Sequence, residues 1–388
     1  MKHLYLLLFS YMVISCTEMR TVTTLDDCDV VATKKNENLT VCELDAVKQT
    51  IALPFSELFK EWGLVKLENT SKEIMVGPDQ RIFISDNYIL IWGEKNKDML
   101  LFDKHGKFQR RFGQPGQGPG DIVGQLAHTQ IDETNDAIYF SDFNPKRISK
   151  YQLSTGKHLG EYPIDIKGMA KFFLDIDKQL LTVACAGKLN DFKICTQKLN
   201  GEKVTTIQNN FDEAGWREVF LWNNNDDDIL YYNYELPREK DSLYHYDISS
   251  NKLIPYFSID FGEKTPDHRY FVTNQYYIGT INDKLEMSPG YTAYPEKWLF
   301  IDKHSLKGAY ARLVLDRYGD LDVTEVSPCT MFGDYYATIL MPDRLEELCR
   351  KALLENTDLP AESKEELQEL LAGIGEDDNC FVLYGKIN

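Results

Sequence analysis

The sequence predicts an all-β fold, a six-bladed β-propeller with a small helical hairpin inserted in the last blade. A unit of strand, turn and strand recurs along the chain, with its turn at Gly106, Gly156, Gly201 and Asn251. These turns are separated by 50, 45 and 50 residues, which is the length that one blade requires. The strand-like runs are rich in β-branched and aromatic residues and are bounded by Asp, Asn and Gly.

The blades are assigned in order along the chain. In blade one, strands are expected at 81–85, 88–92, 99–103 and 108–112. Blades two, three and four are expected at about 129–164, 172–207 and 219–261. Blade five is expected from 298 to a turn near 319, and blade six from 330 to 384.

The two ends of the propeller are predicted to meet. Residues 51–62 have apolar side chains at mixed helical spacings, which indicates a short helix or an irregular stretch before a strand at 64–67. Propellers commonly close by pairing an N-terminal strand into the blade that the C-terminus builds, because this leaves no free edge. We therefore expect residues 64–67 to pair with residues 381–384 in the last blade.

A helical hairpin is predicted at 342–376, inside blade six. Pro342 stands at the start of the first helix, Ser363 is expected to cap the second with Glu366 returning the bond, and Gly373 ends it. Residues 343–378 contain 12 acidic and 4 basic residues. We expect the acidic side to be solvated, the alternatives being a cap over the channel or a partner site.

The N-terminus carries an export signal. Lys2 precedes an apolar stretch at 4–14, which is too short to cross a bilayer. The stretch ends in Val13-Ile14-Ser15-Cys16, which resembles the bacterial lipobox, and this resemblance implies that Cys16 receives diacylglycerol. The alternative is an ordinary secretory signal that contains a cysteine. We assign 1–15 to the signal peptide, 16–48 to a polar tether and 49–388 to the propeller.

Charge and cysteine content limit the partners and the redox chemistry. With 43 basic and 61 acidic residues, the net charge is −18, which argues against nucleic acid and anionic lipid headgroups as partners. Seven cysteines remain besides Cys16. Cys185 and Cys195 flank a short turn, so either a disulfide across a hairpin or two free buried thiols would fit.

One stretch of blade two resembles a known repeat. Residues 139–151 contain Asp142, Asn144 and Arg147 before an aromatic residue, a pattern similar to the NHL repeat. Together with Cys16, the chain resembles the six-bladed β-propeller lipoproteins of Bacteroides and its relatives. The resemblance spans about residues 50–388 but is clear only in blades one and two, and it implies fold and location rather than chemistry.

The candidate ligand-binding residues are Asp86, Asp142, Asn144 and Arg147. Asp86 and Asp142 follow similar strands and are expected at equivalent strand ends, where a carboxylate can accept backbone N–H bonds of the next turn. The alternative is a ring of carboxylates at one mouth of the channel that holds a cation or sugar hydroxyls. Arg147 would pair with Asp142 or bind an anionic ligand. The glycines at 113–120 would allow a tight passage between blades, or form a ligand-contacting loop.

We therefore predict a lipid-anchored protein of the cell envelope, in the outer membrane, that binds or scaffolds a peptide, a glycan or a partner protein. No linear metal or nucleophile motif occurs, and no cofactor is expected other than Ca²⁺ or another divalent cation. Asp226 to Asp228 are interpreted as a solvated hairpin tip. The alternative function is a metal-dependent hydrolase or lyase at the channel mouth, which would use Asp86 and Asp142.

Overall fold

The computed structural model describes residues 24–387, apart from the gaps at 78–79, 93–98, 115, 117, 119, 123–125, 144, 188, 210–215, 224–228, 237–240, 283–296, 325–328, 333 and 358. Cys16, Asn144 and Asp226 to Asp228 therefore lie outside the described residues. No described helix is long and apolar enough to cross a membrane.

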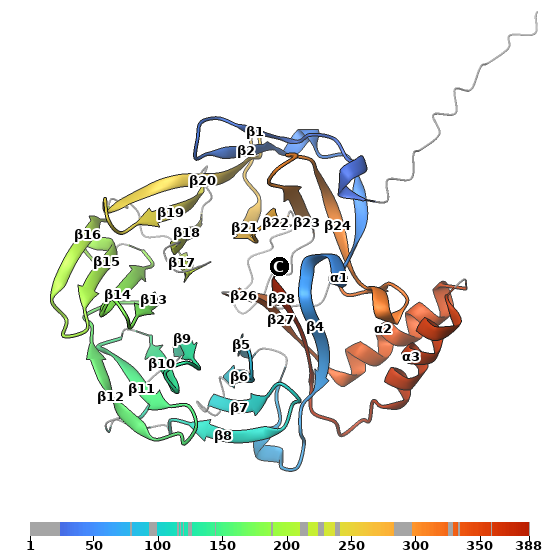
Figure 1. Cartoon of the computed structure of the whole chain (residues 1–388), viewed down its shortest axis with the longest axis horizontal. Helices are drawn as coiled ribbons and strands as arrows, with labels where there is room; N and C mark the ends of the chain where they lie inside the picture. The colour runs from blue at the N-terminus through green and yellow to red at the C-terminus, as the bar shows by residue number, and fades with distance from the viewer. Residues whose placement is uncertain are drawn as a thin grey trace, which may run out of the picture.

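The chain forms six sheets arranged as the blades of a ring (Figure 1). Blades one to three have four strands each, which follow one another from the channel to the rim. Their bounds are β5 (Arg81–Ile84), β6 (Tyr88–Trp92), β7 (Met99–Asp103) and β8 (Phe108–Phe112); β9 (Leu126–Asp132), β10 (Ala137–Asp142), β11 (Arg147–Gln152) and β12 (His158–Pro163); and β13 (Ala170–Asp175), β14 (Leu180–Cys185), β15 (Phe192–Lys198) and β16 (Lys203–Gln208).

Blades four to six are extended at the rim by N-terminal strands. Their own strands are β17 (Trp216–Asn223), β18 (Ile229–Leu236), β19 (Leu243–Asp247) and β20 (Lys252–Asp260); β21 (Asp267–Val272), β22 (Tyr276–Asn282), β23 (Lys297–Asp302), β24 (Gly308–Leu315) and β25 (Leu321–Asp322); and β26 (Cys329–Phe332), β27 (Tyr335–Leu340) and β28 (Phe381–Ile387). The six-bladed prediction is confirmed. The sequence analysis missed the two inner strands of blade five, β21 and β22.

Blade six closes the ring by pairing both ends of the propeller. β4 (Phe59–Lys66) is its outermost strand and runs antiparallel to β28, with Lys66 opposite Phe381 and Gly63 opposite Tyr384. The predicted pairing of 64–67 with 381–384 is confirmed for 64–66. The preceding stretch is a strand, β3 (Thr50–Pro54), and a single helical turn, α1 (Phe55–Leu58).

Residues 24–66 form a segment that we name the N-terminal strap. Besides β3, α1 and β4 it contains β1 (Ala32–Lys34), β2 (Thr40–Glu43) and the 3₁₀ turns η1 (Leu25–Asp27) and η2 (Leu44–Ala46). β2 runs parallel to β20 of blade four, and β3 runs parallel to β24 of blade five. The expected tether at 16–48 is thus corrected for residues 24–48, which lie on the propeller because they add strands to its outer edges.

The cores lie between neighbouring blades. One cluster joins Trp92 and Phe112 of blade one to Phe140 of blade two, and another joins Tyr139 of blade two to Phe172 of blade three. Both faces of a blade are therefore buried, as their nearly continuous apolar runs require. Two further 3₁₀ turns, η3 (Lys72–Ile74) and η4 (Asp316–Tyr318), lie in connections.

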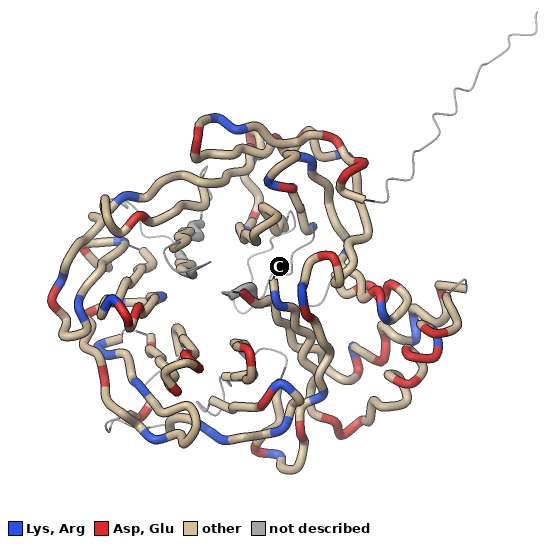
Figure 2. Tube along the Cα trace, in the orientation of Figure 1, with Lys and Arg blue, Asp and Glu red and all other residues tan. Residues whose placement is uncertain are grey.

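The helical hairpin consists of α2 (Pro342–Glu355) and α3 (Ala361–Ala372), beside blade six (Figure 1). Leu345, Leu348 and Leu367 bury it against the propeller core. The predicted cap at Ser363 is wrong, because α3 already begins at Ala361 after Pro360, and Pro360 supplies the extended entry. Glu366 instead forms an ion pair with Arg317 of η4, 3.0 Å from Nε to Oε1. Figure 2 shows the acidic residues along both helices.

The pairing of β4 with β28 predicts that truncating a buried leucine of β28 destabilises the protein far more than truncating an exposed leucine of α2. Leu383 of β28 is fully buried, whereas Leu354 of α2 is 80% exposed. We expect Leu383→Ala to lower the free energy of unfolding by about 2–5 kcal/mol, because it leaves a cavity at the closure. The control Leu354→Ala should change it by less than about 0.5 kcal/mol. Chemical denaturation followed by circular dichroism measures both, and equal effects would contradict the prediction.

Candidate functional site

Arg147 and Asp142 lie at the junction of blades one and two. Asp142 is the last residue of β10 and Arg147 the first of β11, so a short turn separates them. The glycine-rich connection from β8 to β9 crosses the same end of the blade. The structure thus brings Arg147 and this connection together.

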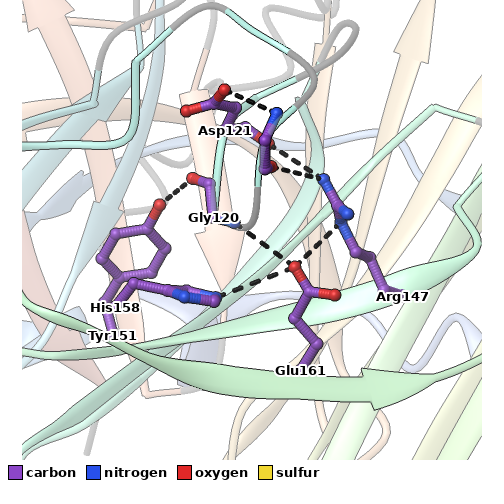
Figure 3. A network of polar contacts seen from close by, with 7 residues as sticks. Gly120, Asp121, Arg147, Tyr151, His158 and Glu161 are labelled. Atoms are coloured by element: carbon purple, nitrogen blue, oxygen red, sulfur yellow. Dashed lines mark hydrogen bonds and ion pairs between the residues drawn. The ribbon is translucent and has the colours of Figure 1, made fainter.

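The guanidinium of Arg147 binds the connection and a strand of its own blade (Figure 3). Its Nη2 donates to the carbonyl oxygens of Gly118 and Asp121, at 3.4 Å each, and its Nε lies 3.2 Å from Oε1 of Glu161 on β12. The expected pairing with Asp142 is therefore replaced by a pair with Glu161, since β12 lies directly beside β11 in the sheet.

Hydrogen bonds between residues of the glycine-rich connection also hold it in shape. The Oδ2 atom of Asp121 accepts the N–H of Gly118 at 2.7 Å, and its Oδ1 accepts from Gln114 at 2.9 Å. The hydrogen bond from Gln114, and after it the one from Gly118, holds the pKa of Asp121 below its usual range. The carboxylate thus stays charged and organises the loop.

Gly120 is required where the connection meets blade two. Its φ is +80°, and a Cβ there would lie 2.8 Å from the His158 ring and 2.9 Å from the Tyr151 hydroxyl. Its N–H donates to Glu161 at 3.3 Å, and its carbonyl accepts from Tyr151. Burial raises the pKa of Tyr151 to about 12, so the hydroxyl remains a donor. The network in Figure 3 therefore locks two blades together.

Asp86 lies at the opposite end of the propeller from Asp142. It follows β5, the first strand of blade one, whereas Asp142 ends β10, the second strand of blade two. Because successive strands of a blade are antiparallel, the two carboxylates point to opposite faces of the ring. The predicted equivalence of these positions is wrong, and the two cannot belong to one carboxylate ring.

The Asp86 carboxylate joins blade one to blade six. Its Oδ1 accepts from the Tyr335 hydroxyl at 2.6 Å and pairs with the ammonium of Lys386. Nearby, the Lys104 ammonium lies 4.0 Å from the ring centroid of Tyr384 and 4.5 Å from that of Tyr335. This cluster spans the closure of the ring, so Asp86 also has a structural use.

Cys185 and Cys195 are buried and free. The ladder places Cys195 opposite Val183, so the two cysteines stand diagonally rather than directly across the hairpin. Burial raises the pKa of Cys185 to about 12, which leaves its thiol protonated and unreactive. Of the two alternatives for this pair, the structure has the free thiols.

A third polar cluster was not found from the sequence. The imidazole of His268, at the start of β21, lies 2.9 Å from Oδ1 of Asp241, and Tyr232 donates to Oδ2 of Asp241 at 3.1 Å. These residues join blades four and five. Their separation along the chain gave no linear motif. Among the described residues, no group of three or more His, Cys, Asp or Glu side chains is arranged to hold a metal ion.

Exposed apolar side chains are more frequent on blades two and three than elsewhere in the described chain. The described chain exposes six large apolar residues, and four of them lie on these blades: Phe143, Leu159, Leu189 and Val204. Blades two and three, residues 126–208, contain 11 basic and 10 acidic residues, so they are nearly neutral in a chain of net charge −18. We name this part the blade 2–3 surface. Leu159 and Val204 could not be recognised from the sequence, because an exposed apolar residue of a strand has no local signal that distinguishes it from a buried one.

The fold and these clusters define a six-bladed β-propeller whose polar networks join its blades. The chain belongs to the family described as a domain of unknown function, DUF4934, whose model matches residues 39–386. No curated protein matches it.

The chain is also similar to solved structures of bacterial proteins. A candidate exported protein of Bacteroides fragilis NCTC 9343 is 16% identical, with a TM-score of 0.59 over 88% of this chain and 100% of that one. A DUF4221 member from Bacteroides vulgatus ATCC 8482 is 12% identical, with a TM-score of 0.48 over 84% and 96%. The first supports the fold.

The Arg147 network predicts that replacing Arg147 destabilises the protein more than replacing the neighbouring Lys146. Arg147→Lys loses the planar fork that reaches both carbonyls and Glu161, so we expect the free energy of unfolding to fall by about 1–3 kcal/mol. The amides of Gly118 and Gly120 should exchange faster with deuterium. Lys146→Met removes an exposed pair with Asp165 and should cost less than about 1 kcal/mol. Unchanged amide exchange in Arg147→Lys would show that Arg147 does not hold the glycine-rich connection in place.

The Asp86 cluster predicts a contribution to acid stability. Lys386, and then Tyr335, hold the pKa of Asp86 below its usual value. Its contribution is thus present above the unfolded pKa, near 4, and is lost as the pH falls through the lower folded value. Because the side chain is 64% exposed, we expect at most about 1 kcal/mol.

Urea denaturation from pH 7 to pH 2 measures this contribution. Asp86→Asn should be less stable than the wild type at pH 7, and the two should converge at the acid end. A constant difference across the range would show that the ion pair is not its source. Asp165→Asn, which alters the fully exposed pair with Lys146, is the control.

Proposed function

We propose that this protein is an envelope-anchored propeller lipoprotein that acts as a binding or scaffold module for a peptide, a glycan or a partner protein. Cys16 would carry the lipid and hold the propeller at the outer membrane, in the manner of the Bacteroides-type, NHL-like lipoproteins that it resembles. The description of the Bacteroides fragilis structure as a candidate exported protein agrees with this location.

The observation that carries the proposal is the blade 2–3 surface. Exposed apolar side chains that lie close together commonly mark interaction sites. Phe143 and Leu189 lie in the corresponding turns of these two neighbouring blades, between β10 and β11 and between β14 and β15. Blades two and three contain 11 basic and 10 acidic residues, so they are nearly neutral in an acidic protein. The exposed apolar side chains would therefore supply the affinity for a partner.

The polar residues that seemed suited to a ligand are occupied by the protein itself. Arg147 binds two loop carbonyls and Glu161, and Asp86 binds Tyr335 and Lys386. The hydrolase alternative required Asp86 and Asp142 at one channel mouth. Because they lie on opposite faces, that form of the site does not exist, and we do not propose it.

The proposal predicts where a partner contacts the protein. A photo-cross-linking amino acid would replace Phe143, Leu189 or Val204 in the full chain, expressed in its native host. We expect an adduct of defined mass from each of these positions, because a partner covers them. The control is the same substitution at Leu354, which is more exposed but lies on the acidic hairpin. Equal adducts at Leu354, or none at blades two and three, would overturn the proposal.

A further inference from the structure

The first strands of blades one to three surround one side of the channel and divide their charges between its two ends (Figure 1). Arg81 is the first residue of β5 and Lys171 the second of β13, so both cations stand where these strands begin. Asp132 and Asp175 are the last residues of β9 and β13, and each accepts a backbone N–H of the following turn. Because the four strands of a blade are antiparallel, successive first strands run in the same direction. The two acids therefore lie at the other end of the channel from the two cations.

Arg81 lies at the junction of blades one and two. It stands opposite Trp92 in the β5–β6 ladder, and Trp92 belongs to the apolar cluster that blade one forms with blade two. Directly opposed residues of an antiparallel pair share one face of the sheet, so Arg81 faces blade two. Its guanidinium carbon lies 5.9 Å from the centroid of the Trp92 ring. Among the described residues, Arg81 has no hydrogen-bond or ion-pair partner.

Two buried donors lie in the same junction. The indole Nε1 of Trp92 and the hydroxyl of Thr129 on β9 belong to fully buried side chains, and neither atom has a hydrogen-bond partner in the described part of the chain. Thr129 stands opposite Phe140, which belongs to the cluster between blades one and two, so Thr129 faces blade one. Buried donors are nearly always paired in folded proteins, because an unpaired one is costly. These two would be satisfied by acceptor atoms of a bound molecule.

Lys171 adds a second positive charge beside this junction. Its Nζ donates to the carbonyl oxygen of Ala127 on β9 at 3.0 Å, so an ammonium of blade three lies on the first strand of blade two. Burial, and after it the charges of Lys171 and Arg81, lower the pKa of His128 well below its usual range. His128 is therefore neutral, and both cations lie close to it. Asp142, the last residue of β10, also stands at this end of blade two, but one strand further from the channel.

We propose that the junction of blades one and two, at the channel, binds the carboxylate group of a small anionic ligand. The Arg81 guanidinium, the Trp92 N–H and the Thr129 hydroxyl can all donate, so the ligand has to supply acceptor oxygens. The planar fork of a guanidinium matches a carboxylate with two parallel hydrogen bonds, and such charge-assisted bonds are strong. The charge of Lys171 favours the same ligand. The site goes beyond the proposed function, because it uses none of the exposed side chains of the blade 2–3 surface.

The indole N–H of Trp92 reports on this site in the full chain. Nuclear magnetic resonance of protein with isotope-labelled tryptophan gives one indole signal for each of the five tryptophans, and Trp92→Phe assigns that of Trp92. The probes are glucuronate and N-acetylglycine, a sugar and a peptide-like carboxylate, titrated at constant ionic strength. Their amides are uncharged controls of matched shape. We expect a saturable shift of the Trp92 signal with the carboxylates and none with the amides, and the tighter of the two probes identifies the source of the carboxylate. The signal of Trp298, a buried indole of blade five, should stay in place.

Two substitutions separate the ligand contacts from the fold. Arg81→Met keeps an apolar stem beside the Trp92 ring and removes the charge, so we expect it to weaken binding by about tenfold or more. Thr129→Val keeps the shape of the side chain and removes the hydroxyl, and it should also weaken binding. The control is Arg312→Met, which alters an exposed arginine of blade five and should leave the titration unchanged.

The carboxylate site is overturned if neither probe moves the Trp92 signal, or if the Trp298 signal moves equally, because that indicates a general effect of the salt. Binding by Arg81→Met as tight as by the wild type would also overturn it. Tighter binding of sulfate than of either probe would replace the carboxylate by a tetrahedral anion. If Arg81→Met does not fold, Thr129→Val with unchanged affinity for both probes would count against the site. Cross-linking at the blade 2–3 surface tests the proposed function separately.

Discussion

The pairing of β4 with β28 is the constraint on which the rest of the structure depends. Each blade buries both faces against its neighbours, so no blade is stable by itself and the ring must be closed for any of the cores to be complete. The closure brings residues 59–66 beside residues 381–387, the two ends of the propeller. It also orders the strap, because β3 and β4 are separated only by the single turn of α1 and must follow the rim of blades five and six.

Polar contacts also join neighbouring blades. Arg147 and Glu161 fix the crossing from blade one to blade two, Asp86 fixes blade one to blade six, and Asp241 with His268 fixes blade four to blade five. These polar contacts therefore add to the apolar cores that join neighbouring blades.

The sequence was sufficient for the features that have a period or a strong local signal. Turns at regular spacing predicted the blades, and the apolar spacing around Leu345 and Leu367 predicted the hairpin. The need to close the ring predicted the pairing of residues 64–67 with 381–384. The strands β2 and β3 of the strap were missed because they are four and five residues long, and their partners lie some 210 to 260 residues away. Asp86 and Asp142 were misplaced because similar strand sequences precede them, and only strand order distinguishes an outgoing strand from a returning one.

The strap also determines how far the ring can stand from a bilayer. A free segment from Cys16 to residue 48 could extend about 110 Å, but with the chain bound to blade five from Thr24 onward, only about 30 Å of extended chain remains. Lys307 of blade five holds the backbone at Asp26. A lipid on Cys16, as proposed, would therefore keep blade five within about 30 Å of the membrane, and blades two and three would be the part of the ring on the other side (Figure 1).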